Sequence, residues 1–271
     1  MEAASARPLA VVTGASSGIG LELAKQFATN GFDLIVCAED SAIVSTATEL
    51  EGLGASAEAV QADLARPEGV EQLHGRIAAS GRPVAAIALN AGIGMGGSFA
   101  TDTDLEQELQ IVDLNCRSTV HLAKLVLRDM VARDEGRLLF TSSIASTMPG
   151  SFQAVYNASK SFVQSFALAL REELKDTNIT VTSLMPGPTE TEFFERAEML
   201  DTKVGASDSK DDPEDVARDG FEALMAGKER VVSHSLSTKV QGRASRFMPD
   251  KAKAVMHRRM AEPGSADDDD S

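Results

Sequence analysis

The stretch Leu9-Ala-Val-Val-Thr-Gly-Ala-Ser-Ser-Gly-Ile-Gly20 decides the fold, because it joins a buried apolar run to a glycine-rich turn. The run Leu9–Thr13 predicts a β-strand, and a helix is predicted from Gly18 to Asn30. Glycines at a strand-to-helix turn let backbone N–H groups and the helix N-terminus approach a pyrophosphate. Such a turn can also serve packing alone, but its place in a strand–helix unit favours dinucleotide binding.

The rest of the chain alternates short apolar runs with longer amphipathic stretches, which is typical of βαβ units and a parallel sheet. We therefore predict a single α/β domain over residues 1–262, with no internal repeat or linker. The expected strands are Leu9–Thr13, Asp33–Ala38, Ser56–Gln61, Val84–Leu89, Arg137–Thr141, Thr180–Met185 and Arg230–Ser233. The expected helices are Gly18–Asn30, Ala42–Leu53, Pro67–Ser80, Thr103–Arg133, Pro213–Ala226 and one that bears Tyr156 and ends near Lys175.

The composition argues against several classes of protein. A formal net charge of −15 disfavours a nucleic-acid partner, because phosphates would be repelled. Two cysteines and four dispersed histidines suggest neither a disulfide framework nor a metal site. No apolar run approaches membrane-spanning length and the N-terminus lacks a secretion signal, so we expect a cytoplasmic protein with no membrane span.

The single tyrosine of the 271 residues lies in Tyr156-Asn-Ala-Ser-Lys160. A phenol and an ammonium four residues apart share one face of a helix. A free phenol has a pKa of about 10, and a nearby cation would lower that pKa toward the range where acid–base catalysis is efficient. The same spacing occurs by chance on many helices, so the pair alone is weak evidence of catalysis.

Taken together, the motifs of this chain resemble those of the short-chain dehydrogenase/reductase family. They are Thr13-Gly14-x-x-x-Gly18-x-Gly20, Asn90-Ala91-Gly92, Asn115, Ser143, Tyr156-x-x-x-Lys160 and Pro186-Gly187, and the resemblance extends from Leu9 to about Val232. It implies a Rossmann-type doubly wound sheet of about seven parallel strands with helices on both faces. It also implies a nicotinamide cofactor and interconversion of an alcohol and a carbonyl compound.

The same resemblance implies the catalytic roles. Tyr156 would exchange a proton with the substrate oxygen, Lys160 would lower the pKa of Tyr156 and bond the nicotinamide ribose, and Ser143 would hydrogen-bond the substrate oxygen. Asn115 would hold a water in a proton relay to Lys160; outside this set of residues it would be read as an interhelical polar residue. Ser142 is an alternative to Ser143, but the spacing of thirteen residues before Tyr156 favours Ser143.

The resemblance further implies which residues contact the cofactor. They are Gly14, Ser16, Ser17, Gly18, Ile19, Gly20, Glu39, Asp63, Leu64, Asn90, Ala91, Gly92, Tyr156, Lys160, Pro186, Gly187, Thr189 and Thr191. Asp63 would contact the adenine amino group and Thr191 the nicotinamide carboxamide. Thr189 stands where a branched apolar residue is more usual in the family.

The choice between NAD and NADP depends on the end of the second strand. An acidic residue there accepts hydrogen bonds from the ribose hydroxyls, whereas an arginine accommodates a 2′-phosphate. The chain reads Glu39-Asp40 with no arginine, and Ser17 replaces a basic residue that many NADP-using relatives carry. We therefore expect NAD, with NADP as the alternative; both acids could also simply face solvent.

The substrate is expected to be recognised by the variable parts of the chain. The residues that could line an apolar cleft are Ala145, Met148, Phe152, Phe193, Phe194 and Met199, with residues 190–212 as a mobile substrate-loop insertion. The aromatic side chains of this loop could equally pack it onto the domain. A neutral, fairly hydrophobic alcohol, or the matching ketone or aldehyde, is therefore the expected substrate.

Two further features concern assembly and the C-terminus. Apolar positions on two helices predict a homodimer or homotetramer, namely Leu122, Leu125, Val126, Phe162, Phe166 and Leu170. The basic C-terminal extension, residues 234–262, reads as a solvated helix over the core or a subunit contact, or alternatively as a patch for an anionic lipid or acidic partner. Residues 263–271 are predicted to be a disordered acidic tail.

Two other functions stay open at this point. A dinucleotide-binding regulatory or scaffold protein could keep the fold without turnover, although it would have no chemical need for Asn115, Ser143, Tyr156 and Lys160 together. A dehydratase or epimerase on the same fold is the second alternative.

Overall fold

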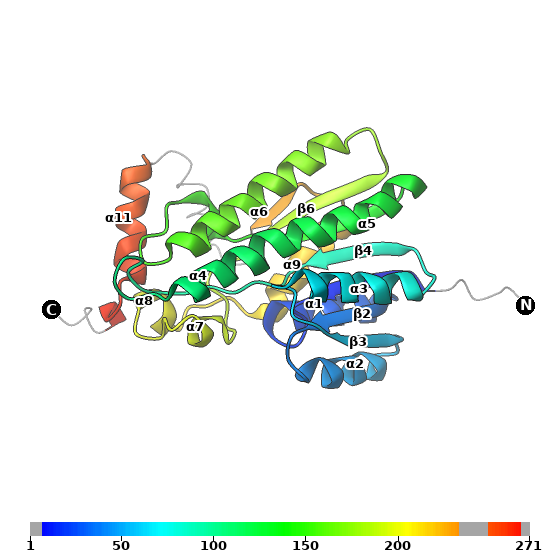
Figure 1. The fold of residues 1–271 in the computed structure, drawn as a ribbon, viewed down its shortest axis with the longest axis horizontal. Coiled ribbons are helices and arrows are strands. Elements are labelled where there is room, and N and C mark those ends of the chain that lie inside the picture. Colours follow the sequence, from blue (N-terminus) through cyan, green and yellow to red (C-terminus); the bar gives the residue numbers. More distant parts are fainter. Residues whose placement is uncertain (1–6, 233–248, 267–271) are drawn as a thin grey trace, which may run out of the picture.

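The computed structural model describes residues 7–232 and 249–266, and its centre is a seven-stranded sheet (Figure 1). The strands are β1 (Leu9–Thr13), β2 (Asp33–Ala38), β3 (Ala57–Gln61), β4 (Val84–Leu89), β5 (Gly136–Thr141), β6 (Ile179–Met185) and β7 (Arg230–Val232). They lie in the order β3-β2-β1-β4-β5-β6-β7, and every neighbouring pair is parallel. The order reverses between β1 and β4, where sheets of this kind bind ligands at the carboxyl ends of the strands. The predicted α/β fold with about seven parallel strands is confirmed.

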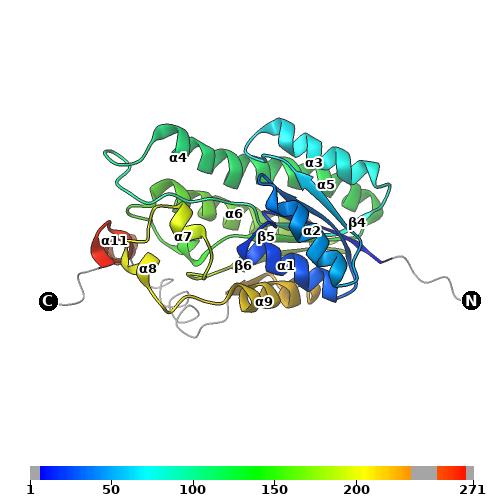
Figure 2. The same ribbon diagram turned by 90° about the horizontal axis from the view of Figure 1, so that it is seen from below.

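Helices cover both faces of this sheet. Their bounds are α1 (Gly18–Thr29), α2 (Ala42–Gly52), α3 (Pro67–Ala79), α4 (Leu105–Ile111), α5 (Thr119–Arg133), α6 (Ala154–Glu173), α7 (Phe193–Arg196), α8 (Lys203–Ala206), α9 (Pro213–Met225) and α11 (Asp250–Ala261). Helices α1, α2 and α9 pack on one face, and α3, α5 and α6 pack on the other (Figure 2). The arrangement is the doubly wound one that the sequence analysis expected.

The central strand β1 shows why the sequence folds in this way. Leu9 and Val11 belong to the core beneath α3, α5 and α6, whereas Ala10 and Val12 belong to the core beneath α1, α2 and α9. Successive side chains of a strand point to opposite faces, so a strand covered on both sides needs a continuous apolar run. Full burial of an aliphatic side chain contributes about 1.5–3 kcal/mol, and this fixes the strand whose end forms the glycine-rich turn.

The single long helix predicted over Thr103–Arg133 is divided into three segments. Between α4 and α5 lies a π-helical segment, Val112–Ser118, which contains Asn115. The Asn115 side chain bonds both backbone groups of Ile93: Oδ1 accepts from the Ile93 N–H at 3.0 Å, and Nδ2 donates to the Ile93 carbonyl at 2.9 Å. π-Helical turns are rare and concentrate at functional sites. Helical periodicity could not reveal this one, because the bonds that accompany it come from a distant loop.

Residues 190–212 and the C-terminal segment fold onto the domain. Phe194, Ala197 and Met199 are buried and form a third small core with Ala261 of α11. Beyond α11 the chain remains in contact with the domain as far as Ala266, whose N–H donates to the Asp201 carbonyl at 3.0 Å. Residues 263–266 of the predicted tail are therefore packed, whereas residues 267–271, and the basic residues Lys239, Arg243 and Arg246, lie outside the described residues.

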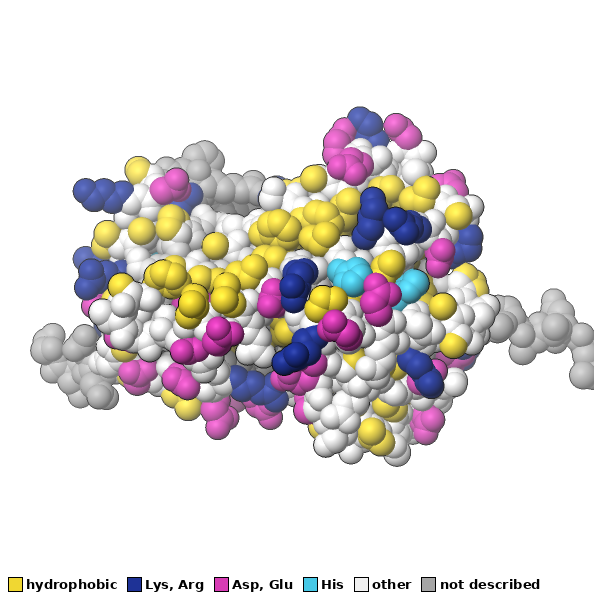
Figure 3. Space-filling view, in the orientation of Figure 1, with side chains coloured by type: hydrophobic (Ala, Val, Ile, Leu, Met, Phe, Trp, Pro, Cys, Tyr) yellow, Lys and Arg dark blue, Asp and Glu magenta, His cyan; other side chains and the backbone are white. Residues whose placement is uncertain are grey.

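The apolar residues predicted to form a subunit contact mostly pack within the chain. Leu122 and Val126 are buried in the core, while Leu125, Phe166 and Leu170 are partly buried against it. Phe162, in contrast, is 44% exposed. Figure 3 shows hydrophobic side chains gathered over α4, α5 and α6. The exposed hydrophobic residues of this part of the chain include Leu105 and Leu109 of α4, Val112 of the π-helical segment and Val120 of α5. The homodimer stays a prediction.

Among residues 7–232 and 249–266, no helix has both the length and the hydrophobicity that a membrane crossing needs.

Candidate active site

A cavity of about 480 Å³ runs along the carboxyl ends of the central strands and reaches α11. Its walls come from the β1–α1 turn, the ends of β2 to β6, the start of α6, and α7. All the residues predicted to contact a dinucleotide line this one cavity, from Gly14 to Thr191. The catalytic candidates Ser143, Tyr156 and Lys160 line it as well, whereas Asn115 does not.

The glycine-rich turn forms a cradle that larger residues would fill. Gly14 and Gly18 have φ values of +65° and +53°, which side chains of L-residues rarely tolerate. A Cβ atom on Gly20 would lie 1.9 Å from the Gly14 carbonyl oxygen. The N-cap residue Ser17 makes no side-chain capping bond, so the first N–H groups of α1 are left for a ligand. This geometry fits the pyrophosphate of a dinucleotide.

The part of the cavity formed by the end of β2, next to the glycine-rich turn, is acidic. Ser16 Oγ donates to Asp40 Oδ2 at 2.7 Å, and Asp40 Oδ1 accepts from the Ala42 N–H at 2.9 Å, so this carboxylate is held at the end of β2. Glu39 is exposed beside it. Among the described residues that line the cavity, the lysine and arginine are Lys160 on α6 and Arg196 on α7. The two residues that follow β2 and line the cavity, Glu39 and Asp40, both carry carboxylates.

Asn90 links the ends of three strands. Its N–H donates to Thr13 Oγ1 at 3.0 Å, and its side-chain Nδ2 donates to the Thr13 carbonyl at 3.2 Å. Thr141 Oγ1 in turn donates to Asn90 Oδ1 at 3.0 Å. The Asn90 side chain therefore joins β1, β4 and β5 at the point where the sheet order reverses.

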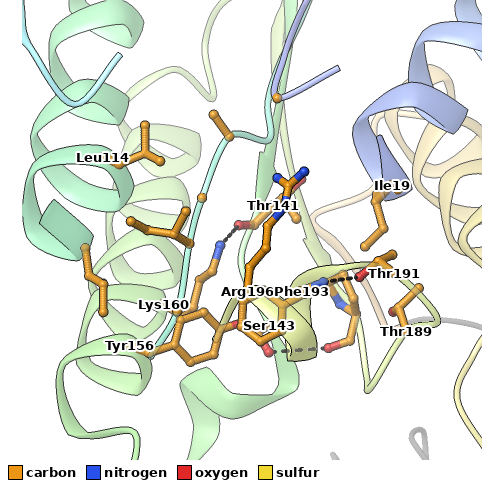
Figure 4. Close-up of a pocket in the computed structure, with 18 of the residues that line it drawn as sticks. Ile19, Leu114, Thr141, Ser143, Tyr156, Lys160, Thr189, Thr191, Phe193 and Arg196 are labelled. Carbon is orange, nitrogen blue, oxygen red and sulfur yellow. Dashed lines mark hydrogen bonds between the residues drawn. The ribbon is translucent and has the colours of Figure 1, made fainter. Parts of the chain in front are cut away.

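Tyr156 and Lys160 project from α6 into the cavity, and Ile19 and Thr191 lie on its opposite side (Figure 4). Lys160 Nζ donates to the Thr141 carbonyl at 3.0 Å and lies 5.8 Å from the centroid of the Tyr156 ring. Ser143 also lines the cavity, and its Oγ accepts a hydrogen bond from the Ala145 N–H at 3.1 Å. The site therefore brings a phenol, a hydroxyl and an amine to one end of the cavity.

The two serines before this site differ in direction. Ser142 Oγ donates to the Lys160 carbonyl at 3.0 Å and so is turned into the protein. Ser143 Oγ donates to the Pro186 carbonyl oxygen at 3.5 Å. Both serines line the cavity, and the choice of Ser143 as the catalytic serine stays a prediction.

The electrostatics of the pair differ from the expectation. Burial raises the pKa of Tyr156 to about 12, and the Ser143 hydrogen bond offsets only part of this rise. Burial also lowers the pKa of Lys160 to about 8. Part of the phenol ring is accessible from the cavity, but the rest is enclosed by protein. The predicted lowering of the Tyr156 pKa by Lys160 is not found, because that lysine loses its charge well below the pH at which this phenol ionises.

Asn115 lies behind the cavity wall and is 1% exposed. Besides its bonds to Ile93, its Nδ2 donates to Ser159 Oγ at 2.9 Å. Asn115 Oδ1 and Lys160 Nζ each lie 3.1 Å from the position that a Cβ atom on Gly92 would occupy, so the two side chains meet around this glycine. Its place in a proton relay stays a prediction.

The substrate end of the cavity confirms part of the expected apolar lining and adds polar residues. Ala145, Met148, Phe193 and Phe194 line the cavity, whereas Phe152 and Met199 do not. Gln153 and His257 also line it, and sequence reasoning missed both. Gln153 lies one helical turn before Tyr156, and this spacing was the sequence signal that could have identified it as a cavity residue. His257 belongs to the basic C-terminal segment, and no motif marks it.

Comparisons with known proteins show the family to which this chain belongs. The family model for short chain dehydrogenases matches residues 8–200. "Dehydrogenase/reductase SDR family member 7B" of Mus musculus is 32% identical over 232 residues, which are 82% of this chain and 72% of that protein. "1-deoxy-11-beta-hydroxypentalenate dehydrogenase" of Streptomyces exfoliatus is 32% identical over 229 residues, 83% of this chain and 82% of that protein. A solved short-chain dehydrogenase from Sphingobium yanoikuyae in complex with NADPH superposes with a TM-score of 0.78 and 26% identity, covering 88% of this chain and 93% of that one.

Proposed function

This chain belongs to the short-chain dehydrogenase family, and from that premise we propose that it interconverts a neutral, largely apolar alcohol and its ketone or aldehyde, using a nicotinamide dinucleotide. The observation that carries the proposal is the convergence of Ser143, Tyr156 and Lys160 at one end of a cavity whose other end is a glycine cradle. Apolar side chains dominate the walls next to Tyr156, and the ring of Phe193 lies 5.1 Å from the Tyr156 ring.

Each of the three side chains has a distinct task in this proposal. The bound nicotinamide supplies or accepts the hydride. Tyr156 donates its phenolic proton to the carbonyl oxygen during reduction and takes it back during oxidation. Ser143 donates a hydrogen bond to the same oxygen as negative charge develops there. Lys160, fixed by the Thr141 carbonyl, holds a positive charge near the ring at neutral pH, since its pKa of about 8 keeps it mostly protonated there.

The high pKa of Tyr156 has a consequence for direction. A phenol with a pKa of about 12 is fully protonated at neutral pH and is therefore ready to act as an acid. Reduction of a carbonyl needs that acid, whereas oxidation of an alcohol needs the deprotonated form. We expect reduction to be the faster direction near pH 7 in the presence of the reduced cofactor.

We further propose NAD as the preferred cofactor. The support is the acidic end of the cavity, where Asp40 is anchored by Ser16 and Glu39 stands beside it in the chain. Carboxylates at this position accept from ribose hydroxyls and repel a 2′-phosphate. Several similar proteins are named for the phosphorylated form, among them "NADP-dependent 3-hydroxy acid dehydrogenase YdfG" of Salmonella typhi, which is 28% identical over 66% of this chain. Fluorescence titration with NADH and NADPH decides the matter, and tighter binding of NADPH would reverse this assignment.

The catalytic proposal is tested with Tyr156→Phe, using the preferred cofactor and a panel of ketones and alcohols. We expect turnover to fall by about 10²–10⁴-fold, because the acid–base group is removed while the ring is kept. Binding of the reduced cofactor should change little. The adjacent serines give a matched pair: Ser143→Ala should lower turnover by about 10²-fold, and Ser142→Ala should keep most of it. Unchanged turnover in Tyr156→Phe would refute the proposal and favour a non-catalytic dinucleotide-binding protein.

A further inference from the structure

Helix α11 closes the substrate end of the cavity and is held there by the loop that precedes α6. Ser151 Oγ donates to the Ala254 carbonyl at 3.2 Å. The Arg258 guanidinium carbon lies 5.6 Å from the centroid of the Phe152 ring, a cation–π contact. These contacts turn the inner face of α11, the face that lines the cavity, toward the end of the cavity that contains Tyr156.

His257 lies on this inner face, lines the cavity and is 5% exposed. Its Nδ1 lies 3.0 Å from the Ser151 carbonyl oxygen. Because a carbonyl can only accept a hydrogen bond, Nδ1 must carry the hydrogen. Burial lowers the pKa of His257, so the ring is neutral near pH 7 and its Nε2 is a hydrogen-bond acceptor.

No donor within residues 7–232 and 249–266 satisfies this acceptor. The hydrogen bond of the His257 ring within these residues is the one that Nδ1 makes with Ser151. Among the described residues, several fully buried side-chain atoms lack a hydrogen bond, and His257 Nε2 is not one of them. Because Nε2 has no hydrogen bond there either, it must keep some accessible surface. Since the ring is almost entirely buried and lines the cavity, we assign that accessible surface to the cavity.

Gln153 supplies a second acceptor that lines the same cavity. It is 7% exposed and lies two positions from Ser151, the partner of His257. Its Nε2 donates to Met199 Sδ at 2.9 Å, which orients the amide and leaves Oε1 without a donor among the described residues. An amide oxygen and an imidazole nitrogen that line the cavity therefore lack donors among residues 7–232 and 249–266.

We propose that His257 Nε2 and Gln153 Oε1 each accept a hydrogen bond from a hydroxyl or N–H hydrogen that the substrate carries away from its reacting carbon. This inference rests on the proposed function and narrows its substrate class to hydroxyketones, diols and their N–H analogues. A site built to hydrogen-bond a substrate hydroxyl discriminates strongly against the analogue that lacks it, because the acceptors of the site are then left unpaired. A second carbonyl or a carboxylate at that position would present one more acceptor and is disfavoured.

Two variants of His257 separate substrate recognition from structural support. In His257→Asn the side-chain amide replaces Nδ1, so the bond to Ser151 can be kept while the acceptor at the ε position is lost. In His257→Gln the amide reaches the ε position, so the acceptor is kept while the bond to Ser151 is lost. His121→Asn is the control, because His121 bonds Glu71 at 2.8 Å and does not line the cavity.

The experiment compares kcat/KM for matched ketones that differ only in a remote hydroxyl or methyl group, with the hydroxyl placed at successive positions. We expect the wild-type protein to prefer one hydroxylated isomer by about tenfold or more. His257→Asn should bring that ratio close to one, whereas His257→Gln and His121→Asn should largely keep it.

Two outcomes would overturn the inference. One is wild-type turnover with no preference for any hydroxylated isomer. The other is a preference that His257→Asn retains and His257→Gln loses, which would show that His257 acts through Ser151 alone. Absence of turnover with every ketone and alcohol, with either nicotinamide cofactor, would instead overturn the proposed function, and this inference with it.

Discussion

The ionisation of Tyr156 can be measured without interference, because the chain contains one tyrosine and no tryptophan. The near-ultraviolet absorbance of tyrosinate therefore reports this side chain alone. At pH 10 an ordinary phenol is half ionised, whereas a phenol with a pKa of about 12 is roughly 1% ionised. We predict that the folded protein without ligand shows almost no tyrosinate at pH 10. The same protein unfolded in denaturant should show about half of the full signal at this pH.

Lys160→Met is the perturbation that tests the underlying reasoning. The pKa of Lys160 is lowered to about 8, so this amine is neutral throughout the range in which Tyr156 ionises. Removing it should therefore leave the Tyr156 midpoint almost unchanged. Ser143→Ala should raise the midpoint further, since the Ser143 hydrogen bond lowers the pKa of Tyr156. Tyr156→Phe should abolish the signal and serves as the blank.

The measurement is best made as a rapid pH jump, because a native protein can unfold at high pH and expose its tyrosine. The absorbance amplitude within the mixing time reports the folded state, and circular dichroism follows unfolding separately. A native midpoint at or below pH 10 that Lys160→Met raises would refute the reasoning. It would show that the ammonium lowers the phenol pKa directly, as the sequence motif had suggested.

Three other predictions concern the turn, the reaction and the surface. Gly20→Ala should lower the free energy of unfolding, measured by denaturant titration, by about 1–3 kcal/mol and should weaken NADH binding, because its Cβ atom would lie 1.9 Å from a backbone oxygen of the turn. The control Gly75→Ala, in open space on α3, should leave this free energy unchanged or raise it. In steady-state assays the ratio of alcohol oxidation to carbonyl reduction should rise about tenfold per pH unit from pH 7 to 9, because the raised pKa of Tyr156 leaves a small deprotonated fraction that grows with pH. A ratio that does not change with pH would contradict this. Phe162→Lys should convert a dimer to a monomer in light-scattering measurements. The control Val44→Lys, exposed on α2 at the opposite face of the sheet, should leave the dimer intact. A wild-type monomer would disprove the homodimer.

The sequence predicted the sheet and the cofactor cradle because their causes are local. A strand buried on both faces must be continuously apolar, and a tight strand-to-helix turn needs glycine at fixed positions. Both constraints are written into Leu9–Gly20 and are found in the structure. The alignment of Tyr156 and Lys160 on one helix face follows from the helical repeat alone.

The parts that the sequence did not reveal depend on contacts between distant segments. The π-helical segment around Asn115 is accompanied by hydrogen bonds to Ile93, which no periodicity encodes. His257 reaches the cavity only because α11 packs against the loop at Ser151, more than a hundred residues earlier in the chain. The pKa of Lys160 likewise reflects burial and not its spacing from Tyr156.

The strand order has a consequence for how the protein is made. Because β1 pairs with β2 on one side and with β4 on the other, a nascent chain can assemble β1, β2 and β3 while one edge of its future central strand is still bare. An uncovered apolar strand edge is a template for pairing with other chains. Until Val84–Leu89 has left the ribosome, this edge of β1 lacks its partner strand, so we expect the nascent chain to be prone to aggregation during that interval.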